Sequence, residues 1–243
     1  TEDPLTDVVP LQRATSGEEG AIPATMYSMD PVAKLGLLKM DFLGLTNLTI
    51  LDRSIKLIKE RRGEQLNLND IPLDNKAAFD MLGEAETFGV FQLESDGMRR
   101  WVKELKPTSV SDISAMIALF RPGPMEHIPR FIDNKHGRSK ITYPHPDLQP
   151  ILEETYGIIV YQDQVLHILR TFAGYTLGEA DIVRKAMGKK IASLMQEERE
   201  NFVKGAGNLG YDRSIAEQVF DLIEPFAGYA FNKAHSVSYA VVA

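Results

Sequence analysis

The sequence has no cysteine, so the chain can form no disulfide, no thiolate zinc site and no cysteine nucleophile. It also has no apolar run near the roughly 20 residues that a membrane-spanning helix requires. Its first residues lack the basic segment and the apolar stretch of a secretory signal. These absences predict a cytoplasmic protein that has no membrane among its partners.

Positive charge is also in deficit, because 27 Lys and Arg residues stand against 34 Asp and Glu residues and give a net charge of −7. This balance argues against a uniformly basic protein that binds polyanions, although it leaves room for local basic patches. An apolar fraction of 44% and a charged fraction of 25% are typical of a folded globular protein. Because the chain starts at Thr1 and stops in an apolar stretch, we expect it to be a piece of a longer protein.

Hydrophobic periodicity predicts a mainly α-helical fold behind one short β element, after an irregular lead-in of about 30 residues. The strand is predicted over residues 37–43, between Gly36 and Gly44, because side chains alternate there in character. A second brief strand is expected over 88–93. Helices are expected from Leu48 to Gly63, after the cap residues Asp74, Ser95, Ser111 and Thr176, over 125–135, 146–155, 160–173, 191–206 and 213–226, and from Lys233 onward.

Asp41 is the first candidate for chemistry. A strand over 37–43 places Lys39 and Asp41 on one face, while Met40 and Phe42 make the surroundings of the carboxylate apolar. A carboxylate in such a place needs a partner. The partner is either Lys39, in an ion pair at a sheet edge, or a metal ion used in phosphoryl transfer. The second interpretation requires at least two carboxylates, so Asp41 alone does not complete it.

A basic run, Arg184–Lys190, is predicted to end a helix. Cations in a last helical turn favour the helix dipole, so one interpretation is an ordinary solvated helix end. The other is an anion site. A nucleotide P-loop is excluded, because Val183 and Lys190 occupy the positions that require Gly and Ser or Thr.

Two further segments combine residue types that bind anions. Residues 231–236 place an aromatic ring, an amide, a cation and an imidazole at a predicted helix start, where anions are favoured, although a lone surface histidine is the common alternative. A turn made of Pro122, Gly123 and Pro124 presents Arg121. The histidines show no spacing typical of metal ligands. A locally basic stretch around this turn contains Arg121, Arg130, Lys135, Arg138 and Lys140.

Six of these segments occur in the same order as in one known family. They resemble the α subunit of bacterial DNA polymerase III, the C-family of replicative polymerases, and the resemblance covers nearly the whole chain. Agreement of six ordered motifs is highly specific. The matching segments are residues 38–45, 89–95, 119–124, 156–162, 184–190 and 231–235.

The resemblance implies a domain organisation and a set of sites. Residues 1–45 are similar to the end of a polymerase-β-like palm, and residues 46–243 to a helical fingers domain. Asp41 matches the third palm carboxylate, a metal ligand, and Lys39 a lysine that faces the active site. The residues expected at the incoming nucleotide are Arg184, Lys185, Lys189, Lys190, Asn232, Lys233 and His235, with His235 crowding the sugar, and those expected at DNA are Arg121, Arg130, Lys135 and Arg138.

The resemblance also implies the reaction of the intact subunit. Two Mg²⁺ ions, template–primer DNA, deoxynucleoside triphosphates and replisome subunits that include a sliding clamp are its expected cofactors and partners. Because the other two palm carboxylates would lie upstream of Thr1, the chain alone is expected to be inactive. The alternative is a non-catalytic helical module that binds nucleic acid or an acidic protein.

Overall fold

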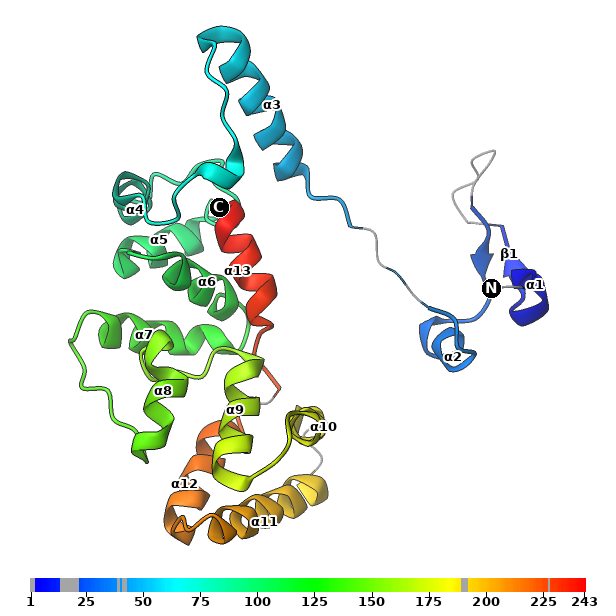
Figure 1. Cartoon of the computed structure of the whole chain (residues 1–243), viewed down its shortest axis with the longest axis vertical. Helices are drawn as coiled ribbons and strands as arrows, with labels where there is room; N and C mark the ends of the chain where they lie inside the picture. The colour runs from blue at the N-terminus through cyan, green and yellow to red at the C-terminus, as the bar shows by residue number, and fades with distance from the viewer. Residues whose placement is uncertain (1–2, 14–21, 39, 41–42, 189–191, 227) are drawn as a thin grey trace. The chain divides into compact units, whose positions relative to one another are not determined.

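The computed structural model describes residues 3–13, 22–38, 40, 43–188, 192–226 and 228–243 (Figure 1). The chain divides into two compact units, Thr1–Arg53 and Ser54–Ala243, each of which is described by itself. The described residues form thirteen α-helices, four short 3-10 helices and one two-stranded sheet. The predicted fold class, mainly α-helical, is therefore confirmed.

The first unit contains only short elements. These are α1 (Leu5–Val8), β1 (Leu11–Gln12), β2 (Ala24–Thr25), α2 (Met29–Lys34) and the start of α3 (Thr46–Arg62). The strands β1 and β2 pair antiparallel, with Leu11 opposite Thr25 and Gln12 opposite Ala24. Val9 is the one residue of this unit that is buried among those described, so little apolar surface holds it together.

The strand predicted over 37–43 is wrong for the residues that the structure describes there. Leu38, Met40 and Leu43 have no strand conformation and are 79%, 65% and 88% exposed. A strand requires a neighbouring strand to bond its N–H and C=O groups, and the described sheet consists of β1 and β2 alone. Lys39 and Asp41 lie outside the described residues, as does Phe42.

The second unit is built from helices in two clusters. After η1 (Leu68–Asp70), its elements are α4 (Lys76–Gly83), α5 (Asp96–Leu105), α6 (Val110–Leu119), η2 (Pro124–His127), α7 (Ile128–Lys135), η3 (Pro146–Leu148), α8 (Gln149–Leu152), η4 (Glu153–Thr155), α9 (Gln162–Ala173), α10 (Leu177–Gly188), α11 (Ala192–Asn208), α12 (Arg213–Ile223) and α13 (Lys233–Val242). None of the described helices is long and apolar enough to cross a membrane.

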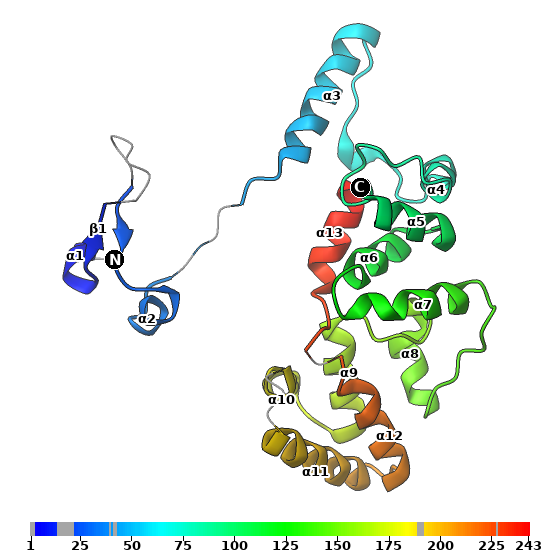
Figure 2. The same ribbon diagram turned by 180° about the vertical axis from the view of Figure 1, so that it is seen from behind.

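The first cluster surrounds α6. Every residue of α6 from Asp112 to Leu119 is buried, because α13, α5, η2 and η4 contact it. Helix α13, the last of the chain, packs along α6, and both views show it there in red beside the green helices (Figures 1 and 2). The core of this cluster includes Phe131, Ile132 and Met116. The C-terminal helix is thus part of a core whose other buried residues lie between Leu82 and Tyr161.

The second cluster joins α9, α10, α11 and α12. The rings of Phe202 and Phe220 lie 5.6 Å apart between α11 and α12, and both are fully buried. Helices α9 and α11 approach closely at Gly205, where a Cβ atom would lie 2.5 Å from the carbonyl oxygen of Ala173. Only glycine fits that crossing without a shift of backbone.

Most of the predicted helix boundaries agree with the structure, and two caps are corrected. Ser95 caps α5 and Thr176 forms a capping box with Glu179, as predicted. Helix α4 is capped by Asn75 and not by Asp74, and α6 by Ser109 and not by Ser111. In both cases the observed cap has extended backbone dihedrals, and its side chain accepts an N–H three residues on.

The brief strand predicted over 88–93 is also wrong. The segment consists of successive turns, in which the N–H of Val90 bonds the carbonyl of Thr87 and the N–H of Leu93 bonds that of Val90. Gln92 has a φ of 65°, a left-handed conformation that no strand accommodates.

A buried ion pair links α6 to α7. Asp112 and Lys135 are 3.1 Å apart, with side chains 2% and 8% exposed. Asp112 also accepts the backbone N–H of Thr108 at 2.9 Å and the hydroxyl of Tyr156 at 2.8 Å. Burial alone would raise the pKa of Asp112, but these bonds and Lys135 outweigh burial and hold that pKa below its usual range.

The Asp112→Asn variant should lower the free energy of unfolding by about 3–5 kcal/mol at neutral pH, because it leaves the buried Lys135 charge without its counter-ion. Since the folded pKa of Asp112 is depressed, its charge stabilises the fold above the unfolded pKa, and this contribution is lost as the pH falls through the folded pKa. Urea unfolding of both proteins should show that their stability difference narrows below about pH 4.

Asp80→Asn is the matched control. Asp80 pairs with Lys76 at 2.6 Å across one turn of α4, with side chains 63% and 85% exposed. Such a pair contributes less than about 1 kcal/mol. The role of the buried pair would be contradicted if both variants lost the same free energy of unfolding. It would also be contradicted if the stability difference between Asp112→Asn and the wild type stayed constant as the pH falls.

Candidate functional site

Helix α13 begins with a polar cap. The Oδ1 atom of Asn232 accepts the backbone N–H of His235 at 3.0 Å. This bond satisfies one of the four N–H groups that a helix start leaves without an intrahelical acceptor. Asn232 and His235 are exposed, whereas Ser236 is fully buried. The cap therefore fixes a turn whose outer side presents polar side chains.

The imidazole of His235 lies between two aromatic rings. Its centroid is 5.6 Å from that of Phe231 and 4.2 Å from that of Tyr239. Tyr239 in turn lies 4.9 Å from the ring of Phe91. Rings on two sides leave the imidazole few rotamers, so it is exposed yet oriented.

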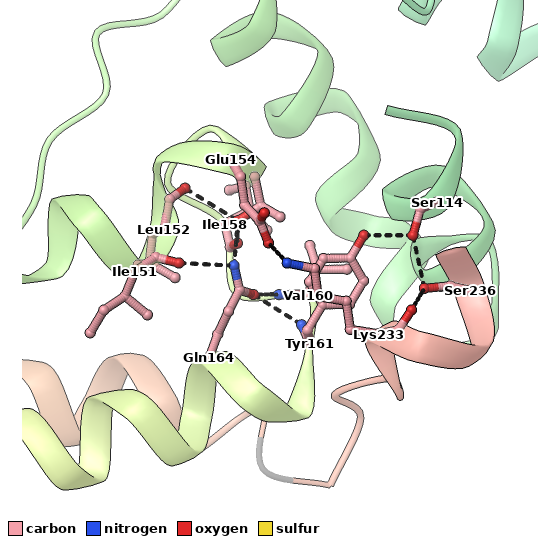
Figure 3. Close-up of polar contacts among 11 residues, drawn as sticks. Ser114, Ile151, Leu152, Glu154, Ile158, Val160, Tyr161, Gln164, Lys233 and Ser236 are labelled. Atoms are coloured by element: carbon pink, nitrogen blue, oxygen red, sulfur yellow. Dashed lines mark hydrogen bonds and ion pairs between the residues drawn. The ribbon is translucent and has the colours of Figure 1, made fainter. Parts of the chain in front are cut away.

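Phe231 is bonded to the start of α9. Its N–H donates to the carbonyl of Val160 at 2.9 Å, and its carbonyl accepts the N–H of Gln162 at 2.9 Å, which makes a parallel bridge between Tyr161 and Phe231. The side-chain oxygen of Gln164 accepts the N–H groups of Val160 and Tyr161 at 2.8 and 3.0 Å. The segments that begin α9 and α13 therefore form one hydrogen-bonded junction, and Figure 3 shows the bonds of Gln164 to Val160 and Tyr161 within it.

Lys233 forms an ion pair at this junction (Figure 3). Its Nζ lies 2.6 Å from Oε1 of Glu154, and the two side chains are 39% and 40% exposed. The ammonium also lies 5.6 Å from the centroid of the Tyr161 ring. An open hollow beside the pair is lined by Ile151 and His167, among others. A partly exposed pair is weak, so Lys233 can exchange Glu154 for another anion at small cost.

The side chain of Arg121 bonds backbone carbonyls in two segments, the end of α6 and the segment before α13. Its guanidinium donates to the carbonyl of Ala118 at 2.8 Å and to that of Tyr229 at 2.7 Å, and it lies 4.4 Å above the ring of Phe231. Burial lowers the pKa of Arg121. Gly123 permits the approach, because a Cβ atom there would lie 3.0 Å from the ring of Tyr229. In this chain Arg121 holds the segment before α13 against the turn after α6.

The other residues predicted at DNA lie in different surroundings. Lys135 is buried against Asp112, whereas Arg130 is exposed on α7. Arg138 is exposed and pairs with Asp133 at 2.8 Å. The structure therefore leaves Arg130 and Arg138 at the surface and uses Lys135 in the core.

The basic pair Arg184 and Lys185 lies on α10 and shares one carboxylate. Arg184 is 2.8 Å and Lys185 2.6 Å from Asp181, and their side chains are 14% and 64% exposed. Hydrogen bonds from Lys185 and Arg184 lower the pKa of Asp181. Lys189 and Lys190 lie outside the described residues.

Helix α9 connects the two groups of candidate residues. Its N-terminal end is bonded to Phe231, just before the cap of α13. Along its length Phe172 and Leu169 pack in one core with Val183 and Met187 of α10. The candidate residues on α10 and those at the start of α13 are therefore both positioned by contacts with α9.

Sequence reasoning missed the carboxylate partners of these cations. Asp181 precedes Arg184 and Lys185 by three and four residues, a spacing at which helical charges pair, so its role was readable from the sequence. Glu154 is 79 residues from Lys233, and no local pattern indicates that contact.

Two family models match the chain. The model described as the bacterial DNA polymerase III alpha subunit finger domain matches residues 47–210, which is more than half of the chain. The model described as the bacterial DNA polymerase III alpha NTPase domain matches residues 1–44. The chain belongs to the bacterial DNA polymerase III alpha subunit family. The family resemblance of the sequence motifs is thereby confirmed.

Curated relatives agree with this assignment. The DNA polymerase III subunit alpha of Halalkalibacterium halodurans is 48% identical over 243 residues, which are 100% of this chain and 21% of that protein. The proteins of the same name from Thermus aquaticus and Bacillus subtilis are each 49% identical, over 99% and 100% of this chain and 20% and 21% of the relatives. The chain therefore spans about a fifth of the length of these polymerase subunits.

The cap of α13 gives a prediction for this member of the polymerase III family. Asn232→Ala should cost about 1 kcal/mol and speed amide hydrogen exchange in the first turn of α13 about fivefold, because the N–H of His235 loses its acceptor. Exchange measured by mass spectrometry on peptides that span residues 231–237 reports the change.

Asn75→Ala removes a similar cap, since Asn75 Oδ1 accepts the N–H of Ala78 at 3.2 Å at the start of α4. It should lower stability by a similar amount and leave exchange in α13 at the wild-type rate. If Asn232→Ala leaves exchange in α13 unaltered, the side chain of Asn232 does not organise this turn.

Proposed function

We propose that this chain acts within a DNA-directed DNA polymerase, with residues 46–243 as fingers that bind the incoming deoxynucleoside triphosphate and residues 1–45 as the end of the palm. Membership of the family and the names of the relatives support the polymerase assignment. The observation that carries the nucleotide site is the pairing of Arg184 and Lys185 with the single carboxylate of Asp181, because it holds two cations within reach of one anion.

The electrostatics of this group suit a triphosphate. The chain as a whole carries a net charge of −7 and repels anions, so local cations are needed to attract one. Arg184 offers a planar fork that bonds phosphate through two N–H groups, and the exposed Lys185 adds a mobile ammonium. The pair of Lys185 with Asp181 is partly exposed and therefore weak, so a triphosphate, which carries more charge than one carboxylate, displaces Asp181 from Lys185.

His235 is the residue proposed to contact the sugar. Its ring is exposed and held between Phe231 and Tyr239. A ring that is held in place excludes a ribose 2′-hydroxyl by crowding, whereas a mobile side chain would move aside. Lys233 and Asn232 flank it, and Lys233 is available to the triphosphate once it leaves Glu154.

The metal part of the proposal rests on Asp41. Among the described residues, no group of three His, Asp or Glu side chains could hold a metal ion. Asp41, which lies outside those residues, is the one ligand that we propose this chain contributes, with Lys39 beside it. Mg²⁺ bound in the intact subunit would lower the barrier for attack by the primer hydroxyl and for departure of pyrophosphate.

DNA and replisome partners are proposed on the same basis. The exposed Arg130 and Arg138 are suited to the phosphates of template and primer, which would make binding dependent on salt and not on sequence. A sliding clamp and other replisome subunits in the bacterial cytoplasm follow from a replicative role. Family membership favours this function over a non-catalytic helical module.

The double variant Arg184→Ala/Lys185→Ala, made in the full-length polymerase subunit, tests the nucleotide site. It should raise the KM for deoxynucleoside triphosphates about 10- to 100-fold, because charge-assisted bonds to the triphosphate are lost. Steady-state primer extension with one nucleotide gives KM and kcat.

The control is Lys76→Ala/Arg213→Ala, which removes the same two kinds of cation from exposed pairs on α4 and α12. This control should leave KM within about twofold of the wild type. An equal rise in KM for both double variants, or no rise for the first, would eliminate the triphosphate assignment.

Asp41→Asn in the full-length subunit should lower kcat at least about a thousandfold, since an amide is a poor ligand for Mg²⁺. Affinity for template–primer DNA, measured by fluorescence anisotropy, should stay near the wild-type value. Asp30→Asn, at an exposed aspartate in the first turn of α2, is the control and should retain the wild-type kcat. Near-normal turnover by Asp41→Asn would refute the ligand role.

A further inference from the structure

Three buried hydroxyl groups form a chain of hydrogen bonds that ends at the backbone of the first turn of α13 (Figure 3). The Oγ atom of Ser114 lies 2.9 Å from the hydroxyl of Tyr161 and 2.9 Å from Oγ of Ser236. Ser236 Oγ donates to the carbonyl of Lys233 at 3.1 Å. Ser114 and Ser236 are fully buried and Tyr161 is 2% exposed. The hydroxyls come from α6, from the segment before α9 and from α13.

The last acceptor sets the direction of these bonds. A carbonyl only accepts, so the single hydrogen of the Ser236 hydroxyl is used on Lys233. Ser236 therefore accepts from Ser114, and Ser114 has no hydrogen left for Tyr161 and accepts from it. The hydrogen bonds run from Tyr161 through Ser114 and Ser236 to the backbone at Lys233.

Apolar side chains could fill these buried positions without any hydrogen bond, so the hydroxyl groups require another explanation. Ser114 stands on α6 among Ala115, Met116 and Ile117, where burying a hydroxyl costs free energy unless it is bonded. A bonded network, unlike apolar packing, holds its members at set distances and angles. The network therefore locates the first turn of α13 relative to α6 and to the start of α9.

His235 is the exposed residue next to the hydrogen-bonded hydroxyl groups of Tyr161, Ser114 and Ser236. It directly precedes Ser236, its N–H is bonded by Asn232, and its ring contacts Phe231, which is paired with the backbone around Tyr161. A shift of Ser236 consequently moves the imidazole.

We propose that Tyr161, Ser114 and Ser236 are positioning residues that set the selectivity of the polymerase for deoxyribonucleoside over ribonucleoside triphosphates. They act through His235, so the inference rests on the proposed contact between His235 and the sugar. Because the three residues are buried, their hydroxyls act without contacting the nucleotide. They hold the imidazole where a 2′-hydroxyl would collide with it.

The test uses the full-length subunit and the ratio of kcat/KM for a deoxynucleotide to kcat/KM for the ribonucleotide of the same base. Ser236→Ala and Ser114→Ala should each lower this ratio about three- to tenfold, the effect of losing about one hydrogen bond. Tyr161→Phe should lower it less, because it removes only the first donor and leaves the bond between Ser114 and Ser236 intact.

Matched controls remove the same atoms elsewhere. Ser238→Ala removes an exposed hydroxyl on α13 that bonds the carbonyl of Ala234 at 2.8 Å. Tyr211→Phe removes a hydroxyl that bonds Asp147 at 2.6 Å, in the second cluster. Both should keep the wild-type ratio. Thermal unfolding of all variants checks that the fold is retained.

His235→Ala separates the possible outcomes. The proposal requires His235→Ala to lower the ratio most, and Ser236→Ala added to it to cause no further loss, as in a double-mutant cycle between coupled residues. If His235→Ala leaves the ratio unchanged, the sugar contact itself is wrong. If His235→Ala lowers the ratio while Ser236→Ala and Ser114→Ala match Ser238→Ala, the sugar contact stands and the positioning role is overturned.

Discussion

The backbone pairing of Phe231 with the residues around Tyr161 is the interaction on which the rest of the helical unit depends. It brings the last helix back to the start of α9, and from there α13 lies along α6 and completes the first core. Arg121 reinforces the pairing by bonding the carbonyl of Tyr229. This backbone pairing therefore holds three features near one another. They are the cap of α13, the ion pair of Lys233 with Glu154 and the buried hydroxyl groups.

Burial divides the ion pairs of the chain into two classes. Lys135 and Asp112 are withdrawn from water, so separating them exposes neither charge to solvent and is costly. The pairs of Lys233 with Glu154 and of Lys185 with Asp181 are partly exposed, and pairs of this kind contribute at most about 1 kcal/mol. A cation in the second class can change partners. The proposed nucleotide site thus includes two cations, Lys185 and Lys233, whose present ion pairs contribute little free energy.

Local signals predicted much of the fold, whereas contacts between distant residues did not follow from the sequence. Thr176 and Glu179 form a capping box from four consecutive positions, and the spacing alone predicted it. The strand predicted over 37–43 is wrong at the residues described there, because a strand depends on a neighbouring strand that local alternation does not reveal. The proposed nucleotide residues were found by family motifs, but the partner of Lys233, which is Glu154, lies 79 residues away and leaves no local pattern.

The two parts of the proposed nucleotide site call for opposite properties. In the proposed reaction the α-phosphate joins the primer and the β- and γ-phosphates leave as pyrophosphate, so the cations must release them, and partly exposed pairs with nearby carboxylates supply a competing partner. The discrimination between sugars that we propose depends instead on one steric contact, which a small shift of the imidazole would relieve. A buried network with every hydroxyl bonded resists such a shift. Exchangeable pairs at the surface and a fixed network beneath the imidazole are therefore two solutions to two different demands of the same reaction.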